Sequence, residues 1–339
     1  DSKLVFVSPD SIRPLSQRVR YNSELQSLDS TVHDYYGMGK GQIESLNGRK
    51  LHNLGFMGQG MTIAVLDAGF MNVDKIAAFR NLNIKGTHNF VAGYDNDVYK
   101  EMDHGTKTLS TIAMNQPTVF VGTAPKADFW LLRTEDYSTE SPAEEDFWIA
   151  AVEFSDSVGV DIISSSLGYH GFDDISMNYR YSDLNGRTAA ISQAASRLAS
   201  KGMILVNSAG NDGMGTWKKI NVPADAHDIL TVGAVSLDKV NAPFSSIGPT
   251  ADGRIKPDVM AYGCPTNVVS GRGYIIPDNG TSFACPLIAG MVACLWQACP
   301  NKSAKEILDI IRQSGNNCQS PDNIMGYGIP DFWSAYQSA

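Results

Sequence analysis

The stretch from Ser282 to Trp296 restricts the fold more than any other part of this sequence. Its apolar residues would cover nearly every face of a helix, which predicts a helix buried on all sides: Phe283, Ala284, Leu287, Ile288, Met291, Val292, Leu295 and Trp296. A small-residue turn at Gly280 and Thr281 leads into this helix, and Ser282 opens it. Backbone N–H groups and the positive end of the helix dipole stabilise negative charge at such a terminus. Ser282 is therefore either a helix cap, the commoner role of a serine there, or a nucleophile.

Two further segments carry groups that would activate a nucleophilic serine. The β-branched run 63–67 predicts a central strand that delivers Asp67 to the carboxyl edge of a sheet, where catalytic groups gather. The alternative is that Asp67 caps a turn before Gly69. His104 opens a small-residue turn into a helix, and its intrinsic pKa near neutrality suits a general base. The alternative for His104 is a structural or merely exposed histidine.

A third segment supplies an uncharged hydrogen-bond donor. Asn211 follows the predicted strand 203–206. A side-chain amide at a strand end can donate to an oxyanion without a charge that would perturb the base. The alternative is an ordinary turn asparagine beside glycine.

These groups occur in the order Asp67, His104, Asn211 and Ser282. The order Asp, His, Ser distinguishes one of three unrelated triad arrangements. Seven short blocks of sequence contain these groups or lie between them, at residues 65–69, 104–106, 165–168, 209–211, 244–249, 256–261 and 279–286. In these blocks and their order, the chain resembles the subtilisin-like serine peptidases, the subtilases, from about Gln42 to the C-terminus.

The resemblance implies an α/β fold with a largely parallel central sheet and helices on both faces. The alternation of strands and helices along the chain predicts the same architecture. Strands are expected at 129–132, 161–166 and 229–235, and helices at 42–54 and 187–200.

The resemblance also implies a serine endopeptidase and a role for each polar group. Ser282 would be the nucleophile, His104 the general base, and Asp67 the group that orients the imidazole. The Asn211 amide and the Ser282 backbone N–H would bind the oxyanion of the tetrahedral intermediate. Two rivals remain, an esterase or acyltransferase with the same triad, and an inactive peptide-binding homologue. Retention of all four catalytic side chains favours an active enzyme.

Substrate contacts follow the family pattern. We expect an exposed edge segment that pairs with an extended peptide, formed by Ser164, Ser165, Ser166, Leu167 and Gly168. Such a strand-pairing segment favours peptide substrates over esters. Together with Ala209 and Gly210, it would wall the pocket for the residue before the scissile bond. Asp212 either biases this pocket toward basic side chains or is a solvated turn aspartate.

Four positions depart from the family pattern, none of them at a catalytic atom: Ala68, Phe70, Cys285 and Leu287. Ala68 stands where a hydroxyl residue is common, so a contact near Asp67 is lost.

Residues 1–40 fall outside the recognisable blocks and predict a linker or a propeptide tail, followed by a peptidase domain over 41–339. The resemblance implies an inhibitory N-terminal propeptide and a secreted or cell-envelope location. Because the chain begins at Asp1 without an apolar leader, we expect a signal peptide to have been removed.

Composition excludes other classes of partner. A net charge of −9 without a basic stretch argues against nucleic acid, and no apolar run is expected to span a membrane.

The five cysteines lie in the last third of the chain. Cys299 with Cys318 is the best candidate for a disulfide, and the alternative is five buried thiols. No cofactor is required by the implied chemistry. The resemblance allows a structural calcium ion, but segment 114–119 matches the family's calcium loop poorly and no metal ligand is assigned.

Overall fold

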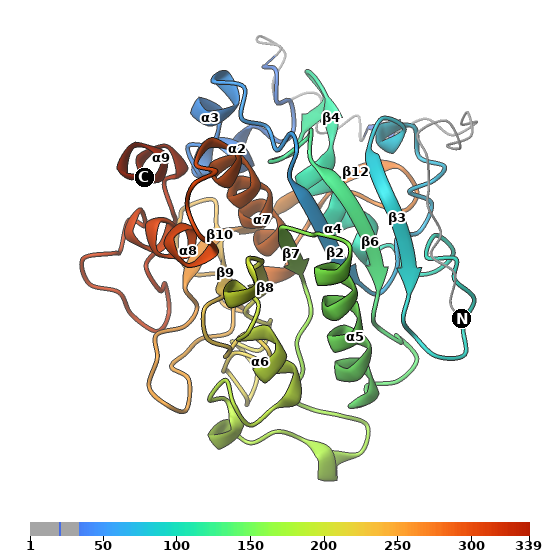
Figure 1. The fold of residues 1–339 in the computed structure, drawn as a ribbon, viewed down its shortest axis with the longest axis vertical. Coiled ribbons are helices and arrows are strands. Elements are labelled where there is room, and N and C mark those ends of the chain that lie inside the picture. The colour runs from blue at the N-terminus through green and yellow to red at the C-terminus, as the bar shows by residue number, and fades with distance from the viewer. Residues whose placement is uncertain (1–19, 22–33) are drawn as a thin grey trace.

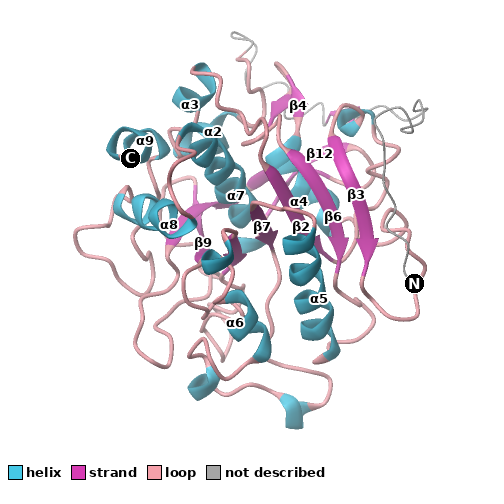
Figure 2. Cartoon of the chain, in the orientation of Figure 1, coloured by secondary structure: helices cyan, strands magenta, loops and turns pink. Residues whose placement is uncertain are grey.

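A parallel β-sheet forms the centre of the molecule in the computed structural model, which describes residues 20–21 and 34–339 (Figures 1 and 2). Within this part of the chain the sheet has seven strands in the order β10-β9-β8-β7-β2-β6-β3, and all neighbours are parallel. The strands are β2 (Thr62–Asp67), β3 (Asn83–Asn89), β6 (Asp128–Arg133), β7 (Ile162–Ser165), β8 (Ile204–Ser208), β9 (Leu230–Ser236) and β10 (Val259–Cys264). The predicted largely parallel sheet is confirmed.

Helices cover both faces of the sheet, and the central strand β2 shows why. Ile63 and Val65 face one hydrophobic cluster, whereas Ala64 and Leu66 face another, because successive side chains of a strand point to opposite sides. The first cluster includes the helices α4 (His104–Ala113), α7 (Thr281–Ala298), α8 (Ala304–Gln313) and α9 (Phe332–Ser338). The second includes α5 (Ala143–Ser157) and α6 (Ala190–Ala195). A strand buried on both faces must be continuously apolar, as this one is.

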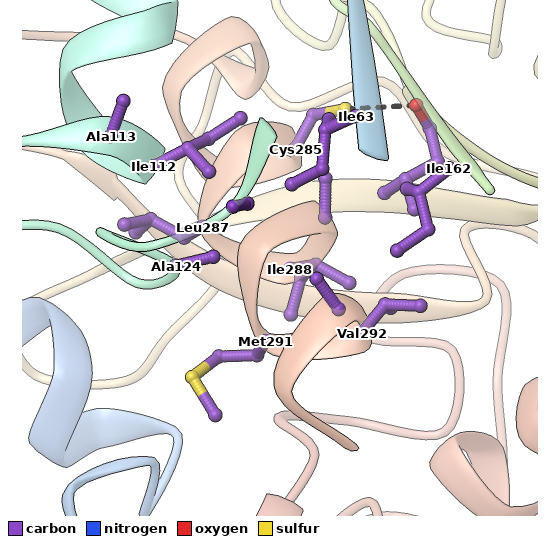
Figure 3. Packing of buried hydrophobic residues seen from close by; sticks show 14 of the residues in the cluster. Ile63, Ile112, Ala113, Ala124, Ile162, Cys285, Leu287, Ile288, Met291 and Val292 are labelled. Carbon is purple, nitrogen blue, oxygen red and sulfur yellow. Dashed lines mark hydrogen bonds between the residues drawn. The ribbon is translucent and has the colours of Figure 1, made fainter. Parts of the chain in front are cut away.

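Helix α7 is the core helix that its sequence predicts. Ile288 and Val292 lie on the side of α7 that faces Ile63 and Ile162 of the sheet, and Leu287 lies toward α4 (Figure 3). By length and composition α7 is also apolar enough to cross a membrane, but 83% of its residues are buried inside the protein. Burial among strands and helices explains the hydropathy of this helix.

The predicted helix 42–54 is instead two short helices, α2 (Lys40–Ser45) and α3 (Arg49–Asn53). Asn47 interrupts the run with a positive φ of 55°. At Gly48 a Cβ atom would lie 2.5 Å from Met291 Sδ, so the chain passes close to the end of that side chain of α7. The predicted helix 187–200 is also too long, since the helix observed there, α6, covers only Ala190–Ala195.

Smaller elements lie around this frame. β11 (Thr266–Val269) pairs antiparallel with β12 (Tyr274–Asp278), and β1 (Arg20–Tyr21) pairs parallel with β12. β4 (Asn115–Gln116) and β5 (Phe120–Val121) form a hairpin. The division at residue 40 remains a prediction, and most of segment 1–40 lies outside the described residues. Within that segment, Tyr36 is buried and contacts His52.

All five cysteines are free thiols, so the predicted disulfide between Cys299 and Cys318 is wrong. Cys299 follows α7 and packs against the main core, whereas Cys318 lies in a turn beyond α8 beside Gln319. Cys285 and Cys294 are buried within α7.

Candidate active site

Asp67 and His104 meet at the carboxyl edge of the sheet. Asp67 is the last residue of β2 and is fully buried, and His104 is the first residue of α4. The Asp67 Oδ1 atom lies 2.7 Å from His104 Nδ1 and also accepts a 2.8 Å hydrogen bond from the Ala68 N–H. Oδ2 accepts from Thr108 Oγ1 at 3.0 Å. The carboxylate is thus held on both oxygens, and the bond at Nδ1 leaves Nε2 as the imidazole nitrogen facing away from it.

The charge of Asp67 sets the electrostatics of the imidazole. Burial disfavours the charged imidazolium, but the neighbouring carboxylate and its hydrogen bond outweigh that effect and raise the pKa of His104 above its ordinary value. A base with a raised pKa accepts a proton more readily near neutral pH.

Ser282 is the second residue of α7 and is 8% exposed. Helix α7 packs against α4, and the ring of Phe283 lies 5.8 Å from the imidazole of His104. The Ser282 carbonyl accepts a 2.8 Å hydrogen bond from Ser166 Oγ, which ties the start of α7 to the segment after β7. Ser282 Oγ forms no hydrogen bond to His104 or to any other residue that the structure describes. Such catalytic bonds are often long without substrate and tighten when it binds.

Asn211 lies beside the same helix start. Its Oδ1 accepts from the Thr281 N–H at 2.9 Å and from Thr281 Oγ1 at 3.0 Å. Because a backbone N–H can only donate, Oδ1 must face Thr281, and the two protons of Nδ2 must point the other way. The Asn211 side chain is exposed and lines the same cavity as Ser282.

Comparison with protein families matches residues 58–328, most of the chain, to the subtilase family. The chain belongs to the subtilase family. It is a serine endopeptidase, a hydrolase that requires no cofactor for its catalysis.

Known subtilases resemble this subtilase along most of its length. Subtilisin NAT of Bacillus subtilis subsp. natto is 28% identical over 283 residues, which is 83% of this chain and 67% of the relative. The thermostable alkaline protease of Halalkalibacterium halodurans is 27% identical over 292 residues, 85% of this chain and 70% of the relative.

Solved structures show the same fold. The crystal structure of MycP1 with its N-terminal propeptide removed has a TM-score of 0.66 at 21% identity, covering 87% of this chain and 96% of that one. MycP1 from Mycobacterium smegmatis has a TM-score of 0.69 at 20% identity, covering 99% of this chain and 89% of that one.

A cavity of about 460 Å³ opens beside Ser282 in this subtilase. Its walls come mainly from the segments after β7 and β8: Glu140, Ser166, Leu167, Gly168, His170, Gly171, Ser208, Gly210, Asn211, Asp212, Asn221 and Ser282. Of the segment expected to bind substrate, only Ser166, Leu167 and Gly168 reach this cavity.

Three residues of the predicted substrate-binding set lie elsewhere. Ser164 and Ser165 are inside β7, a central strand with β2 on one side and β8 on the other, and both are buried. Ser165 Oγ accepts from the indole N–H of Trp148, behind the sheet. Ala209 is also fully buried, whereas its neighbour Gly210 lines the cavity. The part of the segment that reaches the cavity therefore begins where the chain leaves the sheet, at Ser166. Ser166 and Leu167 are also buried, so only Gly168 of the expected exposed segment is partly exposed.

Sequence reasoning missed several residues that shape the site. Thr108 supplies a hydroxyl to Asp67 where Ala68 cannot. Buried Asn207 donates to the Leu167 carbonyl at 3.1 Å and so fixes the loop that walls the cavity. Asn221 donates to Asp212 Oδ2 at 3.0 Å. Thr108 lies one helical turn after His104, a spacing that places both on one face, so the sequence held a signal for it.

A second cavity of about 300 Å³ adjoins the first and shares Glu140 and Leu167 with it. Carboxylates dominate its lining: Glu135, Asp136, Glu140, Glu144 and Asp173. Burial and the neighbouring carboxylates raise the pKa of Glu135 well above its usual range, although the hydrogen bond from Tyr169 opposes this shift. Burial raises the pKa of Glu144 to about 7.

These carboxylates do not gather into a metal centre. In the described part of the chain, no three or more His, Cys, Asp or Glu side chains are grouped so as to hold a metal ion. No metal ligand is therefore assigned.

Proposed function

We propose that this endopeptidase cleaves peptide bonds with Asp67, His104 and Ser282 as its catalytic triad. The observation that carries the proposal is the 2.7 Å contact between Asp67 Oδ1 and His104 Nδ1, beside the start of α7, where Ser282 is the second residue. His104 Nε2 takes the proton of Ser282 Oγ as that oxygen attacks the substrate carbonyl. The same imidazolium then protonates the leaving amine, and water hydrolyses the acyl-enzyme with His104 again as base.

The oxyanion of each tetrahedral intermediate would be bound by two donors. One is the backbone N–H of Ser282 at the positive end of α7, and the other is the Nδ2 amide of Asn211. The bonds from Thr281 to Asn211 Oδ1 support this role, because they hold the amide protons away from Thr281. The donors are thus oriented before charge develops.

Extended polypeptides are the substrates that this geometry favours. Beyond Ser165 the paired residues of β7 end, and Ser166, Leu167 and Gly168 line the cavity beside Ser282. A peptide strand would pair there with the backbone groups other than the Leu167 carbonyl, which accepts from Asn207. An ester or acyl-transfer substrate does not need a segment that pairs with an extended peptide backbone. An inactive peptide-binding protein would not need the hydrogen bonds that hold Asp67 and His104 together.

We further propose that an inhibitory N-terminal propeptide precedes the peptidase domain, which begins near residue 41. The structural relative MycP1 has an N-terminal propeptide, since its crystal structure was solved with that segment removed. Another MycP1 structure belongs to the ESX-1 type VII secretion system, which agrees with a secreted or cell-envelope location for this chain.

A fluorophosphonate probe tests the assignment of the nucleophile. Such probes phosphonylate a serine only when a base activates it, so the purified protein should be labelled and the adduct should map to Ser282 by peptide mass spectrometry. Ser282→Ala should abolish both labelling and casein hydrolysis. Labelling at another serine, or undiminished casein hydrolysis by Ser282→Ala, would overturn the assignment. Turnover of a short-chain ester with no turnover of casein would favour the esterase.

A further inference from the structure

Asp212 lies on the wall of the cavity beside Ser282 and is held there by buried neighbours. The Asn221 side chain, 7% exposed, donates its Nδ2 to Asp212 Oδ2 at 3.0 Å. The Asp212 backbone N–H donates to the buried hydroxyl of Ser246 at 3.0 Å. A solvated turn aspartate would have neither restraint. Its carboxylate is therefore placed by the fold rather than by solvent.

One oxygen of this carboxylate is left for a ligand. Asp212 Oδ1 accepts no hydrogen bond from any described residue, and the Asp212 side chain is 29% exposed. Gly168 and Gly210 also line this cavity, and a Cβ atom on either would lie against Asn221, the residue that anchors Asp212.

The charge around the cavity is negative. Glu140 lines both this cavity and the adjoining one, which Asp136 and Asp173 also line. No lysine or arginine of the described residues lines the cavity. Two cations lie nearby in sequence: Lys219 donates to the Gly248 carbonyl at 2.6 Å, and Lys218 is exposed and does not line the cavity. Field lines from fixed carboxylates concentrate in a concave site and attract a cation.

His170 is the titratable group that faces Asp212. Its Nδ1 lies 3.9 Å from Asp212 Oδ2, beyond hydrogen-bond distance, and its ring stacks on Trp217 at 4.7 Å. The imidazole therefore forms a side wall next to Oδ2 and leaves Oδ1 unpaired.

We propose that this cavity takes an arginine or lysine side chain of the substrate, the residue just before the scissile bond, with Asp212 as its ion-pair partner. This inference rests on the proposed function, because it uses Ser282 to locate the scissile bond. A cavity of about 460 Å³ is large enough for either side chain. Its lining is mostly polar, with Leu167 as the one aliphatic side chain among its described residues, so a large apolar side chain finds little to pack against.

Four peptides that differ only at that residue test the inference. They carry arginine, citrulline, lysine or norleucine, so that each cation has a neutral counterpart of similar length. We expect kcat/KM for the arginine peptide to exceed that for the citrulline peptide about tenfold or more, the size typical of a hydrogen bond to a charged group. Asp212→Asn should bring this ratio close to one, and added salt should lower it in the native enzyme.

Controls separate charge from folding. Asp156→Asn removes an exposed carboxylate at the end of α5, far from the cavity lining, and should keep the arginine-to-citrulline ratio. Asn221→Ala releases the anchor of Asp212 and should lower the ratio even if Asp212→Asn fails to fold. A native ratio near one, or a ratio unchanged by both cavity variants, would overturn the inference while fluorophosphonate labelling of Ser282 still supported the proposed function. Failure of labelling together with failure to cleave any of the four peptides would overturn both.

Discussion

Asn211 shows how much depends on the orientation of a single amide. Both of its hydrogen bonds to Thr281 are accepted by Oδ1, so Nδ2 is the only side-chain donor that it can offer to a substrate. Replacing Asn211 with Ala removes that donor, and we expect kcat to fall about 10²–10³-fold, the loss that follows removal of the oxyanion-hole asparagine in another subtilase. Steady-state turnover of a peptide substrate measures the loss.

Thr281→Val is the matched control for this prediction. It removes only the Oγ1 bond to Asn211, and the backbone N–H of residue 281 still orients the amide. Its loss of kcat should therefore be much smaller than that of Asn211→Ala. Equal losses would mean that Asn211 only supports the start of α7, and near-normal turnover of Asn211→Ala would remove it from the oxyanion hole.

The pH dependence of kcat/KM follows from the pair Asp67 and His104. The carboxylate raises the pKa of His104, and only the neutral imidazole can act as base, so the rate should fall as pH drops through a pKa above 6.5. Asp67→Asn removes the charge and should shift this acid limb to lower pH. It should also lower kcat roughly 10³–10⁴-fold, because the imidazole loses its preferred tautomer. Thr108→Val, which keeps the Asp67 charge, should leave the limb close to its native position.

At this scale the sequence identified the residues that belong to motifs and missed those defined by tertiary contacts. Asp67 ends a strand, His104 and Ser282 lie at helix starts, and Asn211 follows a strand by three residues, which is visible in a one-dimensional pattern. Asn207 contacts a carbonyl 40 residues away and Asn221 contacts Asp212 nine residues earlier, and no local pattern marks either contact. For Asp212, the sequence offered two interpretations, and only the contact with Asn221 favours one of them.

At the scale of elements, helix α7 carries Ser282 and fixes its position by close packing. Gly290 faces the segment after β5, where a Cβ atom would overlap Thr123 Oγ1 and lie 2.9 Å from Thr123 Cβ. Gly290→Ala should gain helix propensity but lose more through overpacking, for a net destabilisation of about 1–2 kcal/mol. Chemical denaturation in a Ser282→Ala background, which prevents self-digestion, measures it.

Gly41→Ala in α2 is the matched control, because a Cβ atom there meets nothing closer than 3.9 Å. This substitution should stabilise the protein by about 0.5–1 kcal/mol through helix propensity alone. Stabilisation of similar size by Gly290→Ala would show that α7 can shift away from Thr123, contrary to the prediction.

The elements themselves were predictable to different degrees. Strands β6, β7, β8 and β9 lie where continuous apolar runs predict them, because a parallel sheet buried on both faces demands such runs. The predicted helix 42–54 failed because Asn47 takes a positive φ of 55°, which separates α2 from α3. Apolar periodicity continues across that break, so it cannot reveal a single residue that leaves the helical conformation.

At the scale of the whole molecule, buried carboxylates make stability depend on pH. Glu145 of α5 is 5% exposed and accepts from Tyr179 Oη at 2.8 Å. Burial raises the pKa of Glu145 from 4.5 to about 7, so the folded state binds a proton that the unfolded chain releases across this interval. The contribution of Glu145 to stability is therefore fully present below pH 4.5 and is lost as pH rises to about 7.

Glu145→Gln stays neutral throughout and still accepts from Tyr179. Relative to the native protein, this variant should gain on the order of 2–3 kcal/mol between pH 4.5 and pH 8. Urea denaturation at both pH values, again with Ser282→Ala, measures the gain. Glu153→Gln, at an exposed position of the same helix, should show no such gain. A difference between Glu145→Gln and the native protein that stays constant with pH would mean that the pKa of Glu145 is the same in the folded and unfolded states, contrary to the prediction.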